Sequence, residues 1–305
     1  MNKQDWEVRT LGRTGFEVTV LGIGSAWLGH QGGGVNDPEV GVQTVLAGLE
    51  SGINLVDTSD NYIGGRSEKI VGQALAHWLG QGHRREDLIL STKLTVHPGN
   101  PEAFTYDGTM RGLEHSLQEL GTDYLDVFLV HDPESLDPVL AEDGCIAALR
   151  KLKADGTIRS IGLGCRPHEF HRTCIETGEF DVSLTFHDYS LMGTTAATGV
   201  LEPAAKHQVG VLNASINAAT HTERNAEKAQ RMSQWCRERD VDLDTLNLHF
   251  CLRETRFASI LIGFSRPARV EQNLRAYRAA IDEEIWVELR RDFDLTRLTT
   301  EGRRP

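Results

Sequence analysis

Residue types that together can transfer a proton lie at the ends of neighbouring apolar segments. Lys93 lies near the end of the run Leu88–Leu94. Asp57 directly follows the run Ile53–Val56, and Tyr62 comes five residues later. A lysine inside an otherwise buried segment is costly unless it is paired, and Asp57 is placed to pair with it. Because a cation favours the phenolate form, we expect Lys93 to lower the pKa of Tyr62 from about 10.

His131 directly follows a third apolar run and completes a group suited to chemistry at a carbonyl. With a lowered pKa, Tyr62 can donate or accept a proton near neutral pH. His131 supplies a second hydrogen bond to a carbonyl or alkoxide oxygen. The pattern therefore predicts Asp57, Tyr62, Lys93 and His131 as the catalytic residues of a reaction at a carbon–oxygen group.

These residues belong to a repeating alternation of short apolar segments and longer amphipathic segments. The short segments are almost continuously apolar, as expected for parallel strands that are buried on both faces. Strict alternation with short connections indicates right-handed crossovers, and eight units in about 260 residues fit a closed (β/α)8 TIM barrel. The predicted strands are Val20–Gly24, Ile53–Val56, Leu88–Leu94, Leu125–Val130, Ile158–Leu163, Val182–Phe186, Gly210–Leu212 and Ser259–Ile262.

The amphipathic segments predict the helices, and a separate segment predicts a β-hairpin. Trp6–Val20 alternates polar and apolar residues around Arg13-Thr14-Gly15, and we expect this hairpin to close the bottom of the barrel. No linker or change in composition interrupts the chain, so residues 1–305 are predicted to form one domain, with the hairpin at 6–20 and the barrel at 20–295. The predicted helices are Pro38–Ser51, Ser67–Leu79, Asp107–Leu120, Gly144–Ala154, Pro167–Thr177, Glu223–Arg239 and Pro267–Ala280.

Composition disfavours several classes of partner. Lysine and arginine total 32 and the acidic residues 44, which gives a formal net charge of −12, whereas nucleic acids and anionic membranes require a basic surface. No apolar run is long enough to span a bilayer, and the N-terminus lacks the apolar core of a signal peptide. Five cysteines without CxxC spacing indicate free thiols in a reducing compartment. We expect a cytoplasmic monomer or small homo-oligomer with a small-molecule substrate, and no metal site, because no third ligand accompanies His168 and His171.

Six segments spread over nearly the whole chain share a known pattern. They read LGRTGFEVTVLGIGSAWLG, SGINLVDTSDNYIGGRSEKIVGQAL, ILSTK, SLQELGTDYLDVFLVHDP, GTIRSIGLG and ILIGFSRPARVEQNL. Together they resemble the aldo-keto reductase family. The stretch TYDGTMRGLEHSLQELGTDYLDVFLVHDP is most similar to the group that contains D-threo-aldose (L-fucose) 1-dehydrogenase, with pyridoxal 4-dehydrogenase and L-galactose dehydrogenase nearby.

The resemblance implies hydride transfer at a nicotinamide cofactor, between NAD or NADP and a sugar or similar small carbonyl or alcohol. The family's catalytic tetrad falls on Asp57, Tyr62, Lys93 and His131. Tyr62 would act as general acid in reduction and general base in oxidation. Lys93, held by Asp57, would lower its pKa, and His131 would orient the substrate oxygen. The alternative is a catalytically silent cofactor-binding regulatory subunit of the same fold.

The resemblance also places the cofactor at the end of the chain. A helix N-terminus attracts phosphate, and the motif assigns the adenosine and pyrophosphate half to Gly263, Ser265, Arg266, Arg269, Gln272 and Asn273. Arg269 falls where NADP-using members place an arginine for the 2′-phosphate, whereas Gly263 falls where many place a lysine, so NAD and NADP both stay open. Gly164-Cys165 stands where the family usually has Ser-Asn. The residues expected at the nicotinamide half are Gly24, Gly164, Cys165 and Ser215.

Three further residues lie on predicted loops at the mouth of the barrel. Trp27, Tyr106 and His187 are candidates to line the substrate pocket. Packing is the alternative role for Trp27 and Tyr106, and a structural pair with Asp188 is the alternative for His187. For Arg269 the alternative is a solvated helix face.

Overall fold

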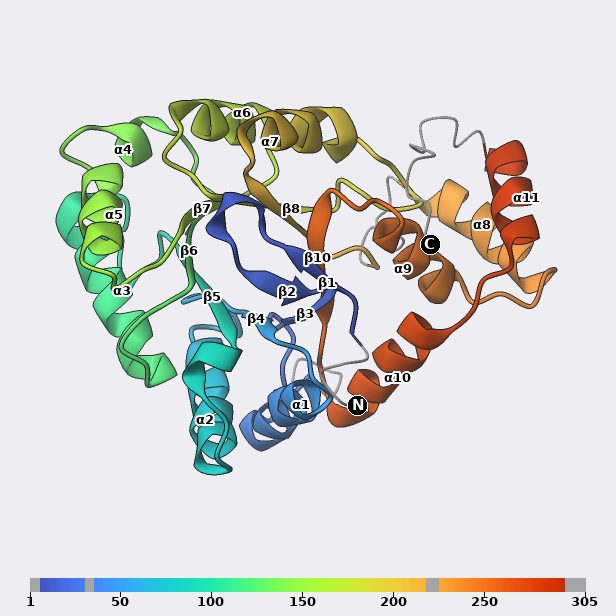
Figure 1. Cartoon of the computed structure of the whole chain (residues 1–305), viewed down its shortest axis with the longest axis horizontal. Coiled ribbons are helices and arrows are strands. Elements are labelled where there is room, and N and C mark those ends of the chain that lie inside the picture. Colours follow the sequence, from blue (N-terminus) through green and yellow to red (C-terminus); the bar gives the residue numbers. More distant parts are fainter. Residues whose placement is uncertain (1–5, 31–35, 218–224, 294–305) are drawn as a thin grey trace.

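A closed barrel of eight parallel strands forms the centre of the molecule. The computed structural model describes residues 6–30, 36–217 and 225–293. The barrel strands are β3 (Leu21–Gly24), β4 (Leu55–Asp57), β5 (Ile89–Leu94), β6 (Val127–His131), β7 (Ile161–Gly164), β8 (Val182–Phe186), β9 (Gly210–Ala214) and β10 (Phe257–Gly263). They follow one another around the barrel in chain order, and β10 closes on β3 (Figure 1). The predicted TIM barrel is confirmed, and the largest displacement of a strand start is at β7, which begins at Ile161 rather than Ile158.

Alternate residues of each strand point into the barrel and fill it. Because strand side chains alternate between two faces, one set packs inside the barrel and the other packs under the helices. The inner set is apolar over most of its depth and includes Leu55, Ile89, Val127, Leu129, Val182, Leu184, Leu212 and Leu261. Polar side chains are therefore displaced to the ends of the strands.

Helices surround the barrel where the amphipathic segments predicted them. They are α1 (Pro38–Glu50), α2 (Ser67–Gly80), α3 (Tyr106–Leu120), α5 (Cys145–Ala154), α6 (His168–Thr177), α8 (Ala226–Arg237) and α10 (Pro267–Arg278). The start of α1 shows why: Pro38 stands at its first position, and Asp37 accepts hydrogen bonds from the amides of Glu39 and Val40. The predicted start of α8 at Glu223, and residues 1–5 and 294–305 of the predicted domain, lie outside the described residues.

Several helices were not predicted from the sequence. They are α4 (Asp137–Leu140), a π-helical turn at Ala197–Leu201 that continues into α7 (Glu202–His207), α9 (Leu243–Leu252) and α11 (Glu283–Phe293). In α9, LDTLNLHFCL, consecutive residues from Leu246 to Leu248 and from Phe250 to Leu252 are all buried. A helix that is buried on most sides lacks the 3.6-residue period on which the prediction relied.

The N-terminal hairpin closes the amino-terminal end of the barrel, as predicted. It consists of β1 (Val8–Thr10) and β2 (Glu17–Thr19), paired antiparallel (Figure 1). Leu11, Phe16 and Val18 pack on the apolar interior of the barrel. Gly12 has a positive φ of 53°, and a Cβ there would meet the amide of Gly210 at 2.1 Å, so only glycine fits this close approach. The hairpin leaves the carboxyl-terminal end of the strands as the open end.

Three further features bear on the expectations about membranes, thiols and metals. Within residues 6–30, 36–217 and 225–293, no helix is long and apolar enough to cross a bilayer. All five cysteines are free and buried, in agreement with the expected free thiols. The same described residues contain no group of three or more histidine, cysteine or acidic side chains arranged to hold a metal ion.

Candidate active site

The buried ion pair between Lys93 and Asp57 lies at the carboxyl-terminal ends of β4 and β5. These strands are neighbours, with Asp57 opposite Ser91 in the register. The Lys93 ammonium donates hydrogen bonds to the Asp57 carboxylate and to the carbonyl of Thr58 (2.6 Å). Ser91 Oγ donates to the second oxygen of Asp57 (2.8 Å). Both charges, which are almost fully buried, are thus satisfied by each other and by neighbouring polar groups.

Tyr62 lies on the turn after β4 and faces Lys93. The amides of Gly65, Arg66 and Ser67 all donate to the Tyr62 carbonyl (3.1–3.2 Å), which fixes the turn. The Lys93 ammonium lies over the Tyr62 ring, with Nζ 4.6 Å from the ring centroid. The ring also meets the His131 ring edge-on, with centroids 5.8 Å apart. The four residues singled out in the sequence therefore converge at one point on the open rim.

The protonation state of Tyr62 differs from the expectation. Burial raises the pKa of Tyr62 above 10, and the carboxylates of Asp57 and Asp132 raise it further, whereas Lys93 lowers it. The prediction of a net lowered pKa is therefore wrong for the protein alone, because desolvation outweighs the nearby cation. Tyr62 keeps its proton at neutral pH and is equipped as a proton donor.

Lys93 remains charged despite its burial. Desolvation favours the neutral amine, but attraction to Asp57 and hydrogen bonds to Asp57 and Tyr62 outweigh it and raise the pKa of Lys93. A permanent ammonium thus lies beside the Tyr62 ring and stabilises negative charge on the phenol when the proton leaves.

His131 is a neutral hydrogen-bond donor at the same rim. Burial, followed by repulsion from Lys93, lowers its pKa to about 3. Its Nδ1 lies 2.9 Å from Thr95 Oγ1, a hydroxyl that can donate to it, and 3.3 Å from Ser59 Oγ. The ring proton is then on Nε2, which lies 3.5 Å from the Asp132 carboxylate. Thr95 was not singled out in the sequence, although its position just after β5 is the signal that marked the others.

Glycines form the rim on both sides of these residues, since Gly24 pairs with Asp57 and Gly164 pairs with His131 in the strand register. A Cβ on Gly263 would meet no atom within 4 Å, and one on Gly164 would make only ordinary contacts at 3.7–3.9 Å, so both leave space. A Cβ on Gly24 would meet the carbonyl of Ile262 at 2.9 Å, so packing between β3 and β10 already requires that glycine. The thiol of Cys165 lies 3.6 Å from His171 on α6, behind the strand, which leaves only its backbone near the rim.

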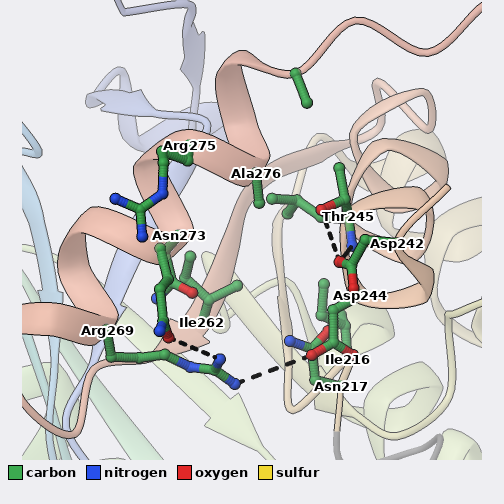
Figure 2. Close-up of a pocket in the computed structure, with 13 residues that line it drawn as sticks. Ile216, Asn217, Asp242, Asp244, Thr245, Ile262, Arg269, Asn273, Arg275 and Ala276 are labelled. Carbon is green, nitrogen blue, oxygen red and sulfur yellow. Dashed lines mark hydrogen bonds and ion pairs between the residues drawn. The ribbon is translucent and has the colours of Figure 1, made fainter. Parts of the chain in front are cut away.

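A cavity of about 480 Å³ lies beside α10 and is lined by three of the residues that the resemblance assigned to the cofactor (Figure 2). Arg269, Gln272 and Asn273 line it, and Asn273 donates to the carbonyl of Gly263 (3.2 Å), which ties the helix to the end of β10. The opposite wall comes from the start of α9, a helix that was not predicted, so its residues were missed: Asp242, Asp244 and Thr245. Asp242, an N-cap residue type before an apolar run, was the available signal.

The N-terminus of α10 suits an anionic group. No acidic residue occupies its first turn, and no side chain caps it. The positive end of the helix dipole therefore fits the phosphates of a dinucleotide. Around this helix start, Arg266 and Ser215 are exposed, and Ser265 is half-buried with its carbonyl bonded to the amide of Gly29 (2.8 Å).

The candidate substrate residues differ in their surroundings. Trp27 is 61% exposed on the loop after β3. His187 follows β8 with a positive φ of 64°, and its buried Nδ1 has no hydrogen-bond partner. The carboxylate of Asp188 pairs with Arg166 (3.1 Å) and His168 (3.4 Å). Tyr106 is the first residue of α3, so its predicted placement on a loop is corrected.

The profile of the Aldo/keto reductase family matches residues 20–291. The chain belongs to this family. Pyridoxal 4-dehydrogenase from Microbacterium luteolum is 29% identical over 93% of this chain and 96% of its own. D-threo-aldose 1-dehydrogenase from a Pseudomonas species is 27% identical, with 90% and 94% covered. L-galactose dehydrogenase from Arabidopsis thaliana is 31% identical, with 88% of each chain covered.

Solved structures agree on the fold. An aldo-keto reductase from Bacillus halodurans, in its holo form, superposes with a TM-score of 0.76 at 24% identity, covering 98% of this chain and 100% of that chain. An aldo/keto reductase from Klebsiella pneumoniae in complex with NADP and acetate gives 0.74 at 21% identity, covering 94% and 95%. This aldo/keto reductase is an NAD(P)-dependent oxidoreductase that acts on carbonyl or alcohol groups of a small molecule.

Proposed function

We propose that this aldo/keto reductase transfers hydride between NAD(P) and an aldose-like sugar, with Tyr62 exchanging the proton. The observation that carries the proposal is the position of the Tyr62 ring beside the buried Lys93 ammonium, 4.6 Å from its nitrogen, at the open rim of the barrel. The substrate class is supported by the names of its relatives, two of which are an aldose dehydrogenase and a galactose dehydrogenase. The small-residue rim and the exposed Trp27 provide room and an aromatic surface for a sugar ring.

The protein residues supply the proton and the charge stabilisation. The nicotinamide cofactor supplies or accepts the hydride when it is bound. In reduction, Tyr62 donates its proton to the carbonyl oxygen, and Lys93 stabilises the phenolate that remains. His131 donates from Nε2 to the same oxygen and fixes its position. In oxidation, Tyr62 takes the proton back, and Asp57 keeps Lys93 in place throughout.

The proposed cofactor and substrate contacts lie in the cavity beside α10 and at the open rim of the barrel. We assign the adenosine half to the cavity with Arg269, Gln272 and Asn273, and the pyrophosphate to the start of α10 with Gly263, Ser265 and Arg266. We assign the nicotinamide to the rim formed by Gly24, Gly164, Cys165 and Ser215. Trp27 and His187, with Tyr106 at the start of α3, are proposed to line the substrate pocket. The five free thiols support a cytoplasmic location.

Replacement of Tyr62 by phenylalanine tests the proposed chemistry. Tyr62→Phe removes only the hydroxyl, so we expect turnover of a sugar and aldehyde panel to fall by about 10²- to 10⁴-fold while the Kd for NAD(P)H stays the same. Tyr124→Phe makes the same change near the amino-terminal end of β6 and should keep full activity.

A Tyr62→Phe variant that retains more than about a tenth of the wild-type rate would contradict the role of Tyr62. Saturable NAD(P)H binding by the wild type without turnover of any sugar, aldehyde or alcohol would instead favour a regulatory subunit. Turnover of small aldehydes without any sugar would overturn the substrate class alone.

A further inference from the structure

The cavity assigned to the adenosine half has an acidic wall that opposes its arginine. Arg269 extends from α10 toward Asp244 at the start of α9 (Figure 2). Its guanidinium lies 4.0 Å from the Asp244 carboxylate, and Nη1 donates to Gln272 Oε1 (3.3 Å). The side chain that the family resemblance assigned to a 2′-phosphate is therefore already engaged by a carboxylate and an amide.

The remaining charges around the cavity do not restore a positive site. Asp242 adds a second carboxylate, which caps α9 by accepting from the amide and hydroxyl of Thr245 (both 2.8 Å). Arg275 lies 3.6 Å from Glu271 on its own helix, which offsets its charge. Gly263 brings no side chain, and Arg266 does not line the cavity. Among the described residues that line it, two arginines therefore face two aspartates.

This balance of charge discriminates between the two nicotinamide cofactors. They differ at one position, where NADP carries a phosphate with nearly two negative charges and NAD carries a hydroxyl. A carboxylate repels the phosphate, whereas it accepts a hydrogen bond from a hydroxyl. Asp244 acts in both ways, because it repels an incoming phosphate and also neutralises the arginine that would attract one.

We infer that this enzyme binds NAD(H) in preference to NADP(H), and that Asp244 is the residue that determines the preference. The inference rests on the proposed placement of the adenosine half in this cavity. Asp244 and Arg269 are both half-exposed, so substitutions at either position are compatible with the fold.

The test measures the Kd of NADH and of NADPH, by fluorescence titration and calorimetry, without any substrate. For the wild type we expect NADH to bind at least about tenfold more tightly than NADPH. Asp244→Asn keeps the size of the side chain and removes its charge, so NADPH should bind at least about tenfold more tightly than it does to the wild type. The Kd of NADH should change less than that of NADPH.

Two further variants test whether the change in NADPH affinity comes from the Asp244–Arg269 pair. In Asp244→Asn/Arg269→Ala the gain in NADPH affinity should be lost, because it depends on the released guanidinium. Asp155→Asn, the same change on an exposed residue at the end of α5, should leave both constants unchanged. Raising the salt concentration should narrow the NADH preference of the wild type, because screening weakens repulsion between exposed charges.

Equal or tighter binding of NADPH by the wild type would overturn the inference, as would an unchanged ratio in Asp244→Asn. Either result would leave the proposed function intact as long as one dinucleotide binds and Tyr62→Phe is inactive. Failure of both dinucleotides to bind the folded wild type would instead remove the cofactor site itself, and with it the proposed function.

Discussion

Removal of the buried lysine should destabilise the fold through the charge that it leaves behind. In Lys93→Met the apolar stem of the side chain is largely kept, but Asp57 loses its counter-ion and retains only the hydrogen bond from Ser91 (2.8 Å). Asp57 is 3% exposed, so water cannot replace the ammonium. Breaking one partner of a buried pair costs about 3–5 kcal/mol of the free energy of unfolding.

The double variant Asp57→Asn/Lys93→Met separates charge from packing. With both charges removed, no ion is left in the interior, and we expect most of the lost free energy of unfolding to return. Turnover should stay as low as in Lys93→Met, because the cation that stabilises the Tyr62 phenolate is absent from both. The second substitution should therefore restore stability without restoring activity.

The dependence on pH gives a second measure of the same charge. Burial raises the pKa of Asp57 above 3.8. An acid whose pKa is raised by folding contributes stability when protonated and loses it as pH rises. In the protein without Lys93 we expect the free energy of unfolding to be larger at pH 5 than at pH 8, and Asp57→Asn/Lys93→Met should lack this difference.

Urea unfolding followed by tryptophan fluorescence at both pH values, together with NAD(P)H consumption, measures these effects. Lys151→Met, which removes a lysine from an exposed pair with Asp155 (2.7 Å), is the control and should unfold like the wild type. If the double variant is as unstable as Lys93→Met, the loss comes from packing, and the reasoning from the unpaired charge is wrong.

Two further predictions concern stability away from the tetrad. Burial raises the pKa of Glu68 to about 7. Between pH 4.5 and 7 the wild type should therefore lose about 3 kcal/mol of unfolding free energy relative to Glu68→Gln, whose amide oxygen still accepts the hydrogen bond from Thr92. Parallel dependence of the two unfolding free energies on pH would refute this. Arg13 binds Asp181 (3.0 Å) and the carbonyls of Gly178 and Phe180 (2.6 and 2.9 Å), so Arg13→Ala should lower the free energy of unfolding by about 1–3 kcal/mol. Because these contacts lie at the closed end of the barrel, KM and kcat should not change, and steady-state kinetics with any active substrate checks this.

The local pattern of the sequence was sufficient for the barrel and for the convergence of the tetrad. Apolar strands with polar ends place Asp57, Lys93 and His131 on one rim, because the carboxyl ends of adjacent parallel strands meet there. Charge pairing then predicts that Lys93 and Asp57 lie together, since neither is stable alone in the interior.

Other properties depend on distances between segments that are far apart in the chain. The pKa of Tyr62 reflects opposing effects of burial, of Lys93 and of two carboxylates. Burial prevails only because of how deeply the phenol is buried and how far these charges lie from it. The acidic wall opposite Arg269, formed by Asp242 and Asp244, likewise could not be predicted from the sequence. The reason is that α9 is buried on most sides and carries no amphipathic period. The sequence alone determined which catalytic groups are present. It also determined at which end of the barrel they lie, because the strand ends follow from local periodicity. Tertiary structure alone decided their protonation and the charge of the cofactor cavity, because desolvation and Coulomb energies depend on the surrounding packing and on separation in space.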